Sequence, residues 1–207
     1  MKLKFINPEL NLESVAIVGS SGSLCEKHYS DIINEHHDVI RFNRAPVTGY
    51  EHIVGSKTTL RAANVHVFRN QPVASKQFEH QEPNFIKNLR NEKILYLGHS
   101  RLTMTEIKNN TNESCDVFIF DYKKLPAVKN ECKYMQNTSP TVGCIAIMLC
   151  LVSGITPSLF GFDVVLQDNT RTHYWENRSP AGPCHNVDYE KKFIKELVKN
   201  KKVKFYD

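Results

Sequence analysis

Short hydrophobic runs alternate with longer mixed segments along the 207-residue chain. The runs are rich in Val, Ile, Leu and Phe and are bounded by glycine or polar turns, which is typical of strands buried in a parallel sheet. The predicted strands are 15–18, 38–42, 94–97, 117–120, 158–161 and 203–206. The helices predicted between them are 30–35, 83–91, 126–134, 141–152 and 187–199.

The order of these elements predicts one α/β domain that covers residues 1–207. Strands that alternate with helices favour a Rossmann-like, doubly wound fold, with a mostly parallel central sheet and helices on both faces. Ligands of such folds bind in loops at the carboxyl ends of the strands. The helix expected from Thr141 is apolar almost all round, so we expect it to be central and buried.

Composition and charge narrow the class of protein. A hydrophobic fraction of 41% and a charged fraction of 24% indicate a folded globular chain. The formal charge of +5 is mild and favours anionic ligands or membrane surfaces. The lysine-rich segment 189–202 suits peripheral contact with an anionic membrane, although such helices more often only pack their apolar face inward. Nothing else in the chain supports nucleic-acid binding.

Cysteine spacing and hydropathy predict the cellular location of the protein. Residues 1–8 lack the apolar core of a signal peptide, and the most apolar stretch, 142–152, is shorter than the ~20 residues that span a bilayer. The six cysteines form no C-x-x-C pair and no zinc-finger spacing, so we expect free thiols and no metal site. We therefore expect a cytoplasmic protein, or one peripheral at the inner membrane face.

A small, glycine-bounded turn, Gly19-Ser20-Ser21-Gly22, directly follows the first predicted strand. Glycine permits close backbone approach, and the serine hydroxyls can donate to phosphate or ribose oxygens. From these four residues alone, an ordinary strand-to-helix turn is the favoured alternative. The Gly-x-Gly-x-x-Gly fingerprint of dinucleotide-binding oxidoreductases and the spacing of a P-loop are both absent, which argues against an NAD enzyme and an ATPase.

Polar residues also close the second predicted strand, at Arg41 and Asn43. The Asn43 amide offers both donors and an acceptor to a base or ribose edge. Two readings stay open from the residues alone. Either Asn43 reads a ligand, or Asn43 caps a loop and Arg41 pairs with a buried carboxylate.

Two late histidines are candidate acid–base groups. His173 precedes Tyr174 and Trp175, and His185 opens the segment 185–190. Imidazole is the side chain best suited to take a proton from a hydroxyl near pH 7. Taken alone, His185 is better explained as a histidine at a helix N-terminus. The alternative for His173 is a loop histidine beside aromatic rings.

Four segments, in order, resemble the sialylmotifs of the eukaryotic-type sialyltransferases, glycosyltransferase family 29. Residues 15–61 resemble the large motif, and residues 140–162 resemble the small motif. Residues 173–176 resemble the third motif, and His185 with Glu190 resembles the very small motif. The resemblance covers 15–197 and implies a GT-A-like variant of the Rossmann-like fold. Val15 and Gly154 stand where secreted members carry a disulfide, so the chain resembles a short, soluble member of bacterial or viral type.

The resemblance implies an activity: transfer of sialic acid from CMP-sialic acid to a glycan or glycolipid hydroxyl, with inversion and without a metal or other cofactor. His185 matches the family's general base. His173 matches the histidine that hydrogen-bonds the departing CMP phosphate. Glu190 is expected to be a structural partner that orients the site.

The resemblance also implies a donor site. The expected donor-binding residues are Gly19, Ser20, Ser21, Asn43, Thr141, Gly143, Gly161 and Phe162, with Arg41, Glu190 and Tyr174 in supporting positions. Ser20 replaces a family asparagine, which removes the two-sided hydrogen bonding of an amide. Thr141 stands where a serine contacts the donor, and the Gly143 backbone sits where the donor approaches closely.

Two other functions remain alternatives. A transferase that uses another CMP-activated keto sugar acid, such as CMP-Kdo, needs the same nucleotide contacts, and Ser20 slightly favours it. An inactive CMP-sugar binding protein needs neither catalytic histidine, so the presence of both argues against it. The acceptor loops, roughly 64–91 and 165–171, do not identify the acceptor.

Overall fold

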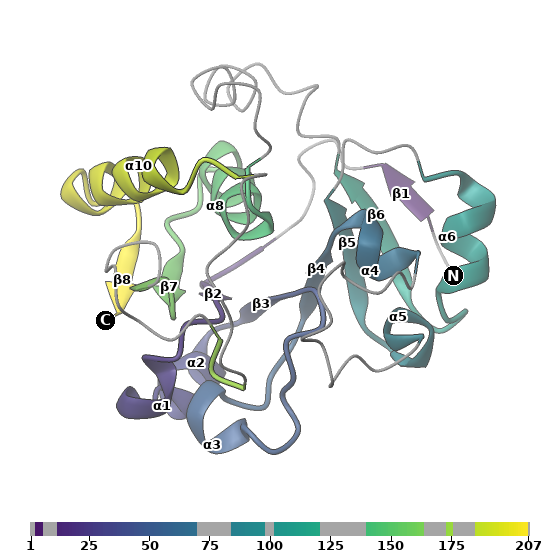
Figure 1. Cartoon of the computed structure of the whole chain (residues 1–207), viewed down its shortest axis with the longest axis horizontal. Coiled ribbons are helices and arrows are strands. Elements are labelled where there is room, and N and C mark those ends of the chain that lie inside the picture. The colour runs from purple at the N-terminus through teal and green to yellow at the C-terminus, as the bar shows by residue number, and fades with distance from the viewer. Residues whose placement is uncertain are drawn as a thin grey trace.

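The sheet at the centre of the molecule is entirely parallel. The structure, a computed structural model, describes residues 3–5, 12–69, 84–97, 102–120, 140–163, 173–175 and 185–206. Within these ranges eight strands pair in the order β1-β6-β5-β4-β3-β2-β7-β8 (Figure 1). They are β1 (Leu3–Phe5), β2 (Val15–Val18), β3 (Asp38–Phe42), β4 (Leu60–Ala63), β5 (Lys93–Leu97), β6 (Asp116–Phe120), β7 (Ser158–Phe160) and β8 (Lys204–Tyr206).

Helices cover both faces of this sheet, as the sequence predicted (Figure 1). They are α1 (Leu24–Lys27), α2 (Ser30–Glu35), α3 (Glu51–Val54), α4 (Val65–Phe68), α5 (Phe85–Asn88), α6 (Met104–Asn110), α8 (Val142–Val152) and α10 (Val187–Lys199). None of the helices in the described ranges combines the length and the apolar character needed to cross a bilayer.

The alternation of side chains along β2 shows how the two faces are filled. Val15 and Ile17 point to the face covered by α8 and α10, and Ala16 and Val18 point to the face covered by α1, α2 and α3. Residues on both faces are buried, which explains the continuous apolar runs in the sequence. The middle of α8 is buried throughout, as its apolar composition predicted.

Several predicted boundaries needed correction. Strand β8 begins one residue later than expected, and β7 stops before Gly161. The helix predicted over 83–91 is only α5, because Asn84 is left-handed (φ 58°) and Leu89 is extended. The helix predicted over 126–134 lies outside the described residues.

Two strands were missed, β1 and β4. Strand β4 reads Leu-Arg-Ala-Ala, so a buried arginine interrupts its apolar pattern. It nevertheless pairs with β3 and β5 in the middle of the sheet. A charged residue in a central strand is outside the usual pattern, and its side chain proves to support the site.

The connectivity creates a switch point beside β2. From β2 the chain proceeds through β3, β4, β5 and β6 on one side, and then returns to add β7 and β8 on the other side. The loops that leave β2 and β7 therefore diverge, and in open α/β sheets this crevice at the carboxyl ends of the strands is where ligands bind.

Candidate active site at the switch point

The turn after β2 is joined to the turn after β7. The Gly19 N–H donates to the Phe160 carbonyl at 2.7 Å, and the Ser21 N–H donates to the Gly161 carbonyl at 3.1 Å. A Cβ on Gly19 would lie 2.3 Å from the Gly161 oxygen, so no larger residue fits there. The structure thus brings together two segments predicted to bind the donor, which are 140 residues apart in sequence.

Ser21 differs from its predicted role. Its side chain is 1% exposed, and its hydroxyl oxygen accepts from the Ser23 N–H at 3.3 Å. The two serine hydroxyls are also 3.1 Å apart. Since the Ser21 hydroxyl is buried in contacts inside the turn, direct donation from it to a ligand is not what the structure supports, and its role is to shape the turn.

Other groups of this turn remain available. In the part of the chain that the structure describes, the N–H groups of Ser20 and Gly22 make no hydrogen bond. Both residues are partly exposed. Backbone N–H groups of a turn that lack a protein partner suit an anion such as a phosphate.

Asn43 lies at the end of β3 in a left-handed conformation, with φ of 45°. Its N–H donates to the Ala62 carbonyl at 2.8 Å, and its side-chain oxygen accepts from the Asn64 N–H at 3.1 Å. The loop-capping reading is therefore correct for the amide oxygen. Among the described residues no acceptor contacts the amide nitrogen, so its two protons are available to a ligand.

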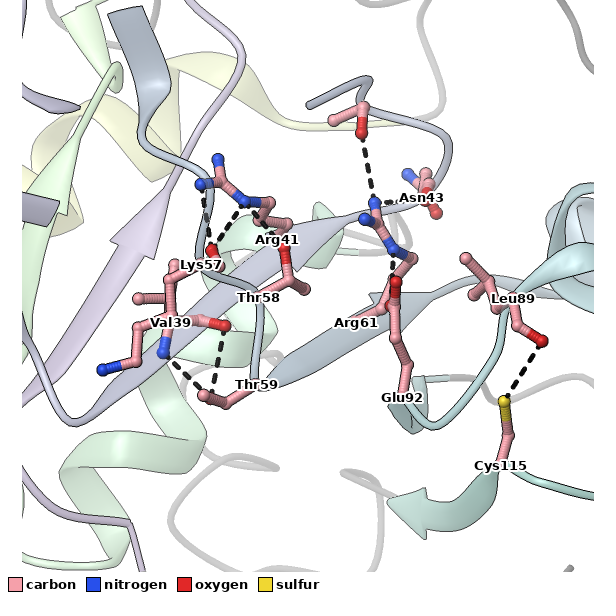
Figure 2. A network of polar contacts seen from close by, with 11 residues as sticks. Val39, Arg41, Asn43, Lys57, Thr58, Thr59, Arg61, Leu89, Glu92 and Cys115 are labelled. Atoms are coloured by element: carbon pink, nitrogen blue, oxygen red, sulfur yellow. Dashed lines mark hydrogen bonds and ion pairs between the residues drawn. The ribbon is translucent and has the colours of Figure 1, made fainter. Parts of the chain in front are cut away.

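Arg41 is 1% exposed and binds the backbone of the loop after α3 (Figure 2). It donates to the carbonyls of Val54, Gly55 and Lys57 at 2.6, 2.9 and 3.0 Å. Burial lowers the pKa of Arg41 to about 10. The alternative in which Arg41 pairs with a buried carboxylate is not observed: within the described ranges its hydrogen-bond partners are carbonyls and the Thr58 hydroxyl.

Arg61 of β4 is a supporting residue that the sequence did not reveal. Its guanidinium donates to the carbonyls of Asn43 and Ala45 at 3.3 and 3.1 Å, and pairs with Glu92 at 3.1 Å (Figure 2). It therefore fixes the segment that carries Asn43. The only signal in the sequence was an arginine inside an otherwise apolar tetrapeptide, Leu-Arg-Ala-Ala.

The N-terminus of α8 forms the opposite wall of the site. Thr141 caps it by accepting from the Cys144 N–H at 3.1 Å. A Cβ on Gly143 would lie 3.1 Å from the Phe162 ring, so this helix end packs directly against the turn after β7. Of the described residues, none accepts a hydrogen bond from the N–H groups of Val142 and Gly143. These groups lie in the first turn of an 11-residue helix, at the positive end of its dipole.

Glu190 of α10 holds this helix end in place. One carboxylate oxygen accepts from the Thr141 N–H and the other from the Thr141 hydroxyl, both at 2.7 Å. Burial raises the pKa of Glu190, which the Thr141 hydrogen bonds and the charge of His185 partly offset. The hydroxyl proton of Thr141 goes to Glu190. In the predicted contact with the sugar donor, the Thr141 hydroxyl could therefore only accept a hydrogen bond.

His185 stands just before α10 and is half-buried. The helix itself is capped by Asn186, whose side chain accepts from the Tyr189 N–H at 3.0 Å. The predicted position at a helix N-terminus is therefore correct. The charge of His185 acts on Glu190, which is hydrogen-bonded to Thr141 at the start of α8.

The segment 173–175 is hydrogen-bonded to the turn after β2. The Tyr174 N–H donates to the Ser20 carbonyl at 2.8 Å, and the Tyr174 hydroxyl donates to the Pro46 carbonyl. Burial raises the pKa of Tyr174. The His173 ring stacks on Trp175 with 4.4 Å between centroids. Glu176 of the predicted third motif lies outside the described residues.

The site gathers hydrogen-bond donors that suit an anion. Its hydrogen-bond donors come from three directions: the turn after β2, the end of β3 and the start of α8. His173 precedes Tyr174, which is bonded to the turn after β2, and the charge of His185 acts on Glu190 beside the start of α8. Across the described ranges, no cluster of three or more His, Cys, Asp and Glu side chains could hold a metal ion.

Comparison with known proteins gives one family. Residues 4–202 match the sequence profile of glycosyltransferase family 29 (sialyltransferase). CMP-N-acetylneuraminate-beta-galactosamide-alpha-2,3-sialyltransferase 2 of Mus musculus is 26% identical over 197 residues, which are 92% of this chain and 56% of that protein. Lactosylceramide alpha-2,3-sialyltransferase of Homo sapiens is 27% identical over 220 residues, covering 91% and 51%. The chain spans about half the length of these relatives.

Solved structures share the fold. A crystal structure of a mammalian sialyltransferase matches with a TM-score of 0.65 and 20% identity, over 94% of this chain and 69% of that chain. A crystal structure of a mammalian sialyltransferase in complex with Gal-beta-1-3GalNAc-ortho-nitrophenol matches with a TM-score of 0.61. The predicted GT-A-like variant of the Rossmann-like fold is therefore confirmed.

Proposed function

The chain belongs to glycosyltransferase family 29 (sialyltransferase), and we propose that it transfers sialic acid from CMP-sialic acid to a hydroxyl group of a glycan or glycolipid. The observation that carries this proposal is the family match over residues 4–202, which includes every element of the site. The relatives are named for the same donor and for galactoside or lactosylceramide acceptors.

The geometry of the site supports a nucleotide donor with a phosphate. In the proposed complex the phosphate lies among the backbone N–H groups of the turn after β2 and of the start of α8. Those of Ser20 and Gly143 are among the N–H groups that make no hydrogen bond in the described ranges. The Asn43 amide nitrogen would donate to the phosphate or the ribose. Such fixed donors need no reorganisation when charge develops on a leaving group.

The proposed reaction is a single displacement that inverts the anomeric centre. The acceptor hydroxyl oxygen bonds to the anomeric carbon while the bond from that carbon to the CMP phosphate oxygen breaks. The acceptor proton passes to the imidazole of His185, which acts as general base. CMP leaves with the bonding electron pair on its phosphate oxygen.

His173 has the complementary role in the proposal. Its neighbour Tyr174 is hydrogen-bonded to the turn after β2. A hydrogen bond donated by the His173 ring to the phosphate would stabilise the departing CMP. We propose that no metal takes part, since the backbone donors and His173 would provide the stabilisation of the phosphate.

Transfer from a different CMP-activated keto sugar acid, such as CMP-Kdo, is the second candidate. Ser20 is the observation that favours it, because a serine replaces the family's asparagine at a donor contact. A purely binding role, without catalysis, is the third. Both share the proposed nucleotide contacts. The second candidate differs from the main proposal in the group transferred, and the third in transferring none.

A lysine-rich surface suggests where a lipid-linked acceptor would be met. Six exposed lysines lie on α10 and the residues after it: Lys192, Lys195, Lys199, Lys201, Lys202 and Lys204. Exposed Asp188 and Glu196 on the same helix offset part of this charge. We propose peripheral contact of this surface with anionic membranes, which is tested by co-sedimentation with phosphatidylserine vesicles at low and high salt. The cytoplasmic location is tested by cell fractionation.

The transferase proposal is tested with the purified protein, CMP-sialic acid or CMP-Kdo, and lactose or lactosylceramide as acceptor. We expect a sialylated product by mass spectrometry, with an inverted anomeric centre by NMR and an undiminished rate in EDTA. Transfer from CMP-Kdo alone would favour the second candidate. CMP binding without any transfer would favour the third.

A further inference from the structure

The turn after β2 is held to the turn after β7 by three successive contacts rather than two. The first two are the backbone hydrogen bonds of Gly19 and Ser21. The third is between side chains, since the Ser23 hydroxyl donates to a carboxylate oxygen of Asp163. Asp163 therefore closes the far end of the turn whose backbone is proposed to hold the donor.

The protons in this cluster can be assigned. The Ser23 hydroxyl has one proton, and it goes to Asp163. The Ser21 hydroxyl, 3.1 Å away, must then donate to the Ser23 oxygen, while it accepts from the Ser23 N–H. A relay from Ser21 through Ser23 to Asp163 follows, and it uses the hydroxyl protons of both serines.

The location of Asp163 indicates more than a contribution to folding. Its side chain is 2% exposed, and Ser23 is its one partner in the ranges that the structure describes. Burying a carboxylate with so few partners is costly. Asp163 is bonded to the turn after β2 through Ser23, and the adjacent residue, Phe162, packs against Gly143 at the start of α8.

We propose that Asp163 is a positioning residue for the donor, which acts through Ser23 and Ser21 to hold the Ser20 and Gly22 N–H groups toward the phosphate. This inference rests on the proposed donor site. A carboxylate is a strong, acceptor-only partner for a hydroxyl, so it fixes the direction of the relay. The hydrogen bond, rather than the charge, carries the effect.

Variants separate the hydrogen bond from the charge. Asp163→Asn keeps an acceptor oxygen for Ser23, whereas Asp163→Ala removes it. We expect Asp163→Ala to raise the Kd of CMP and the KM of the CMP-sugar by about 10-fold with kcat little changed, since binding before and during the reaction is weakened equally. Asp163→Asn should stay within about threefold of the wild type, and Ser23→Ala should add little to Asp163→Ala because the two act as one unit.

Asp38 provides a matched control. It is also a buried carboxylate that accepts from a hydroxyl, that of Thr59 at 2.9 Å, but it lies at the start of β3, at the opposite end of the sheet from the site. Asp38→Ala should lower stability and leave the Kd of CMP unchanged.

The experiment combines calorimetric titration of CMP with amide hydrogen exchange of residues 20–23 for the wild type and these variants. Weakened binding and faster exchange in Asp163→Ala and Ser23→Ala, but not in Asp163→Asn or Asp38→Ala, would support the proposal. Unchanged binding in Asp163→Ala, or binding in Asp163→Asn as weak as in Asp163→Ala, would overturn it. A wild type that binds no CMP would contradict the transferase proposal instead, and the exchange data alone would then decide whether Asp163 orders the turn.

Discussion

Tyr174 and Ser20 are joined by a backbone hydrogen bond of 2.8 Å, from the Tyr174 N–H to the Ser20 carbonyl. The contact connects the segment of His173 with the turn after β2, although the two are far apart in sequence. The Tyr174 hydroxyl adds a second attachment, to the Pro46 carbonyl beyond β3. A buried tyrosine therefore places His173 relative to the proposed phosphate site through its backbone and its ring at once.

This arrangement predicts different effects for two substitutions of Tyr174. Tyr174→Phe loses the hydroxyl but keeps the backbone bond, so the free energy of unfolding should fall by about 0.5–1.5 kcal/mol with CMP affinity little changed. Tyr174→Ala should cost about 3–5 kcal/mol through the cavity and also weaken CMP binding. Urea denaturation and calorimetry measure both. Equal losses in the two variants would contradict the separate role of the ring.

The close approach of Gly19 to Gly161 gives a second prediction. Gly19→Ala places a methyl group 2.3 Å from a backbone oxygen that cannot move without displacing β7. We expect a loss of about 1–3 kcal/mol in unfolding free energy, typical of overpacking, together with loss of CMP binding. Gly154→Ala is the control, since that glycine has a φ of 74° but no atom within 4 Å of an added Cβ. If both variants bind CMP normally, the turn is not part of the donor site.

The raised pKa of Glu190 gives a third prediction, on stability against pH. The folded protein holds the Glu190 proton more tightly than the unfolded chain, in which the pKa of a glutamate is about 4.5. The stability contribution of this group is therefore fully present below about pH 4.5 and is lost as pH rises through the folded value.

Glu190→Gln removes this titration. The unfolding free energy of the wild type minus that of the variant should fall as pH rises from about 4.5 toward neutrality, as measured by urea denaturation at several pH values. A difference that is the same at every pH would show that burial does not raise the pKa of this carboxyl.

The sequence predicted the parts of the fold whose periodicity is simple. The strands β2 and β5 and the buried helix α8 follow from runs of apolar residues, because both of their faces are covered. Strand β4 was missed because Arg61 breaks its apolar run. That arginine is stabilised by carbonyls and by Glu92, partners that only the folded chain brings together.

The candidate site was predicted in the same uneven way. The glycines and Asn43 were identified from the motifs, and the structure brings them to one edge of the sheet. The sequence could not show that Ser21 turns inward, since this depends on Ser23 and on the distant Asp163. Contacts between side chains far apart in sequence have no local pattern from which they could be predicted.

In the proposed function, this chain binds a CMP-activated sugar, and His185 acts on the acceptor rather than on the donor. The most direct measurement is calorimetric titration of CMP, CDP, UDP and NAD into the wild type and His185→Ala in EDTA, followed by kcat with CMP-sialic acid. We expect selective CMP binding that survives His185→Ala, with kcat reduced by about 10²–10⁴-fold. The proposed function would be contradicted by binding without preference for CMP or by a requirement for NAD or a metal. Undiminished kcat in His185→Ala would also contradict it.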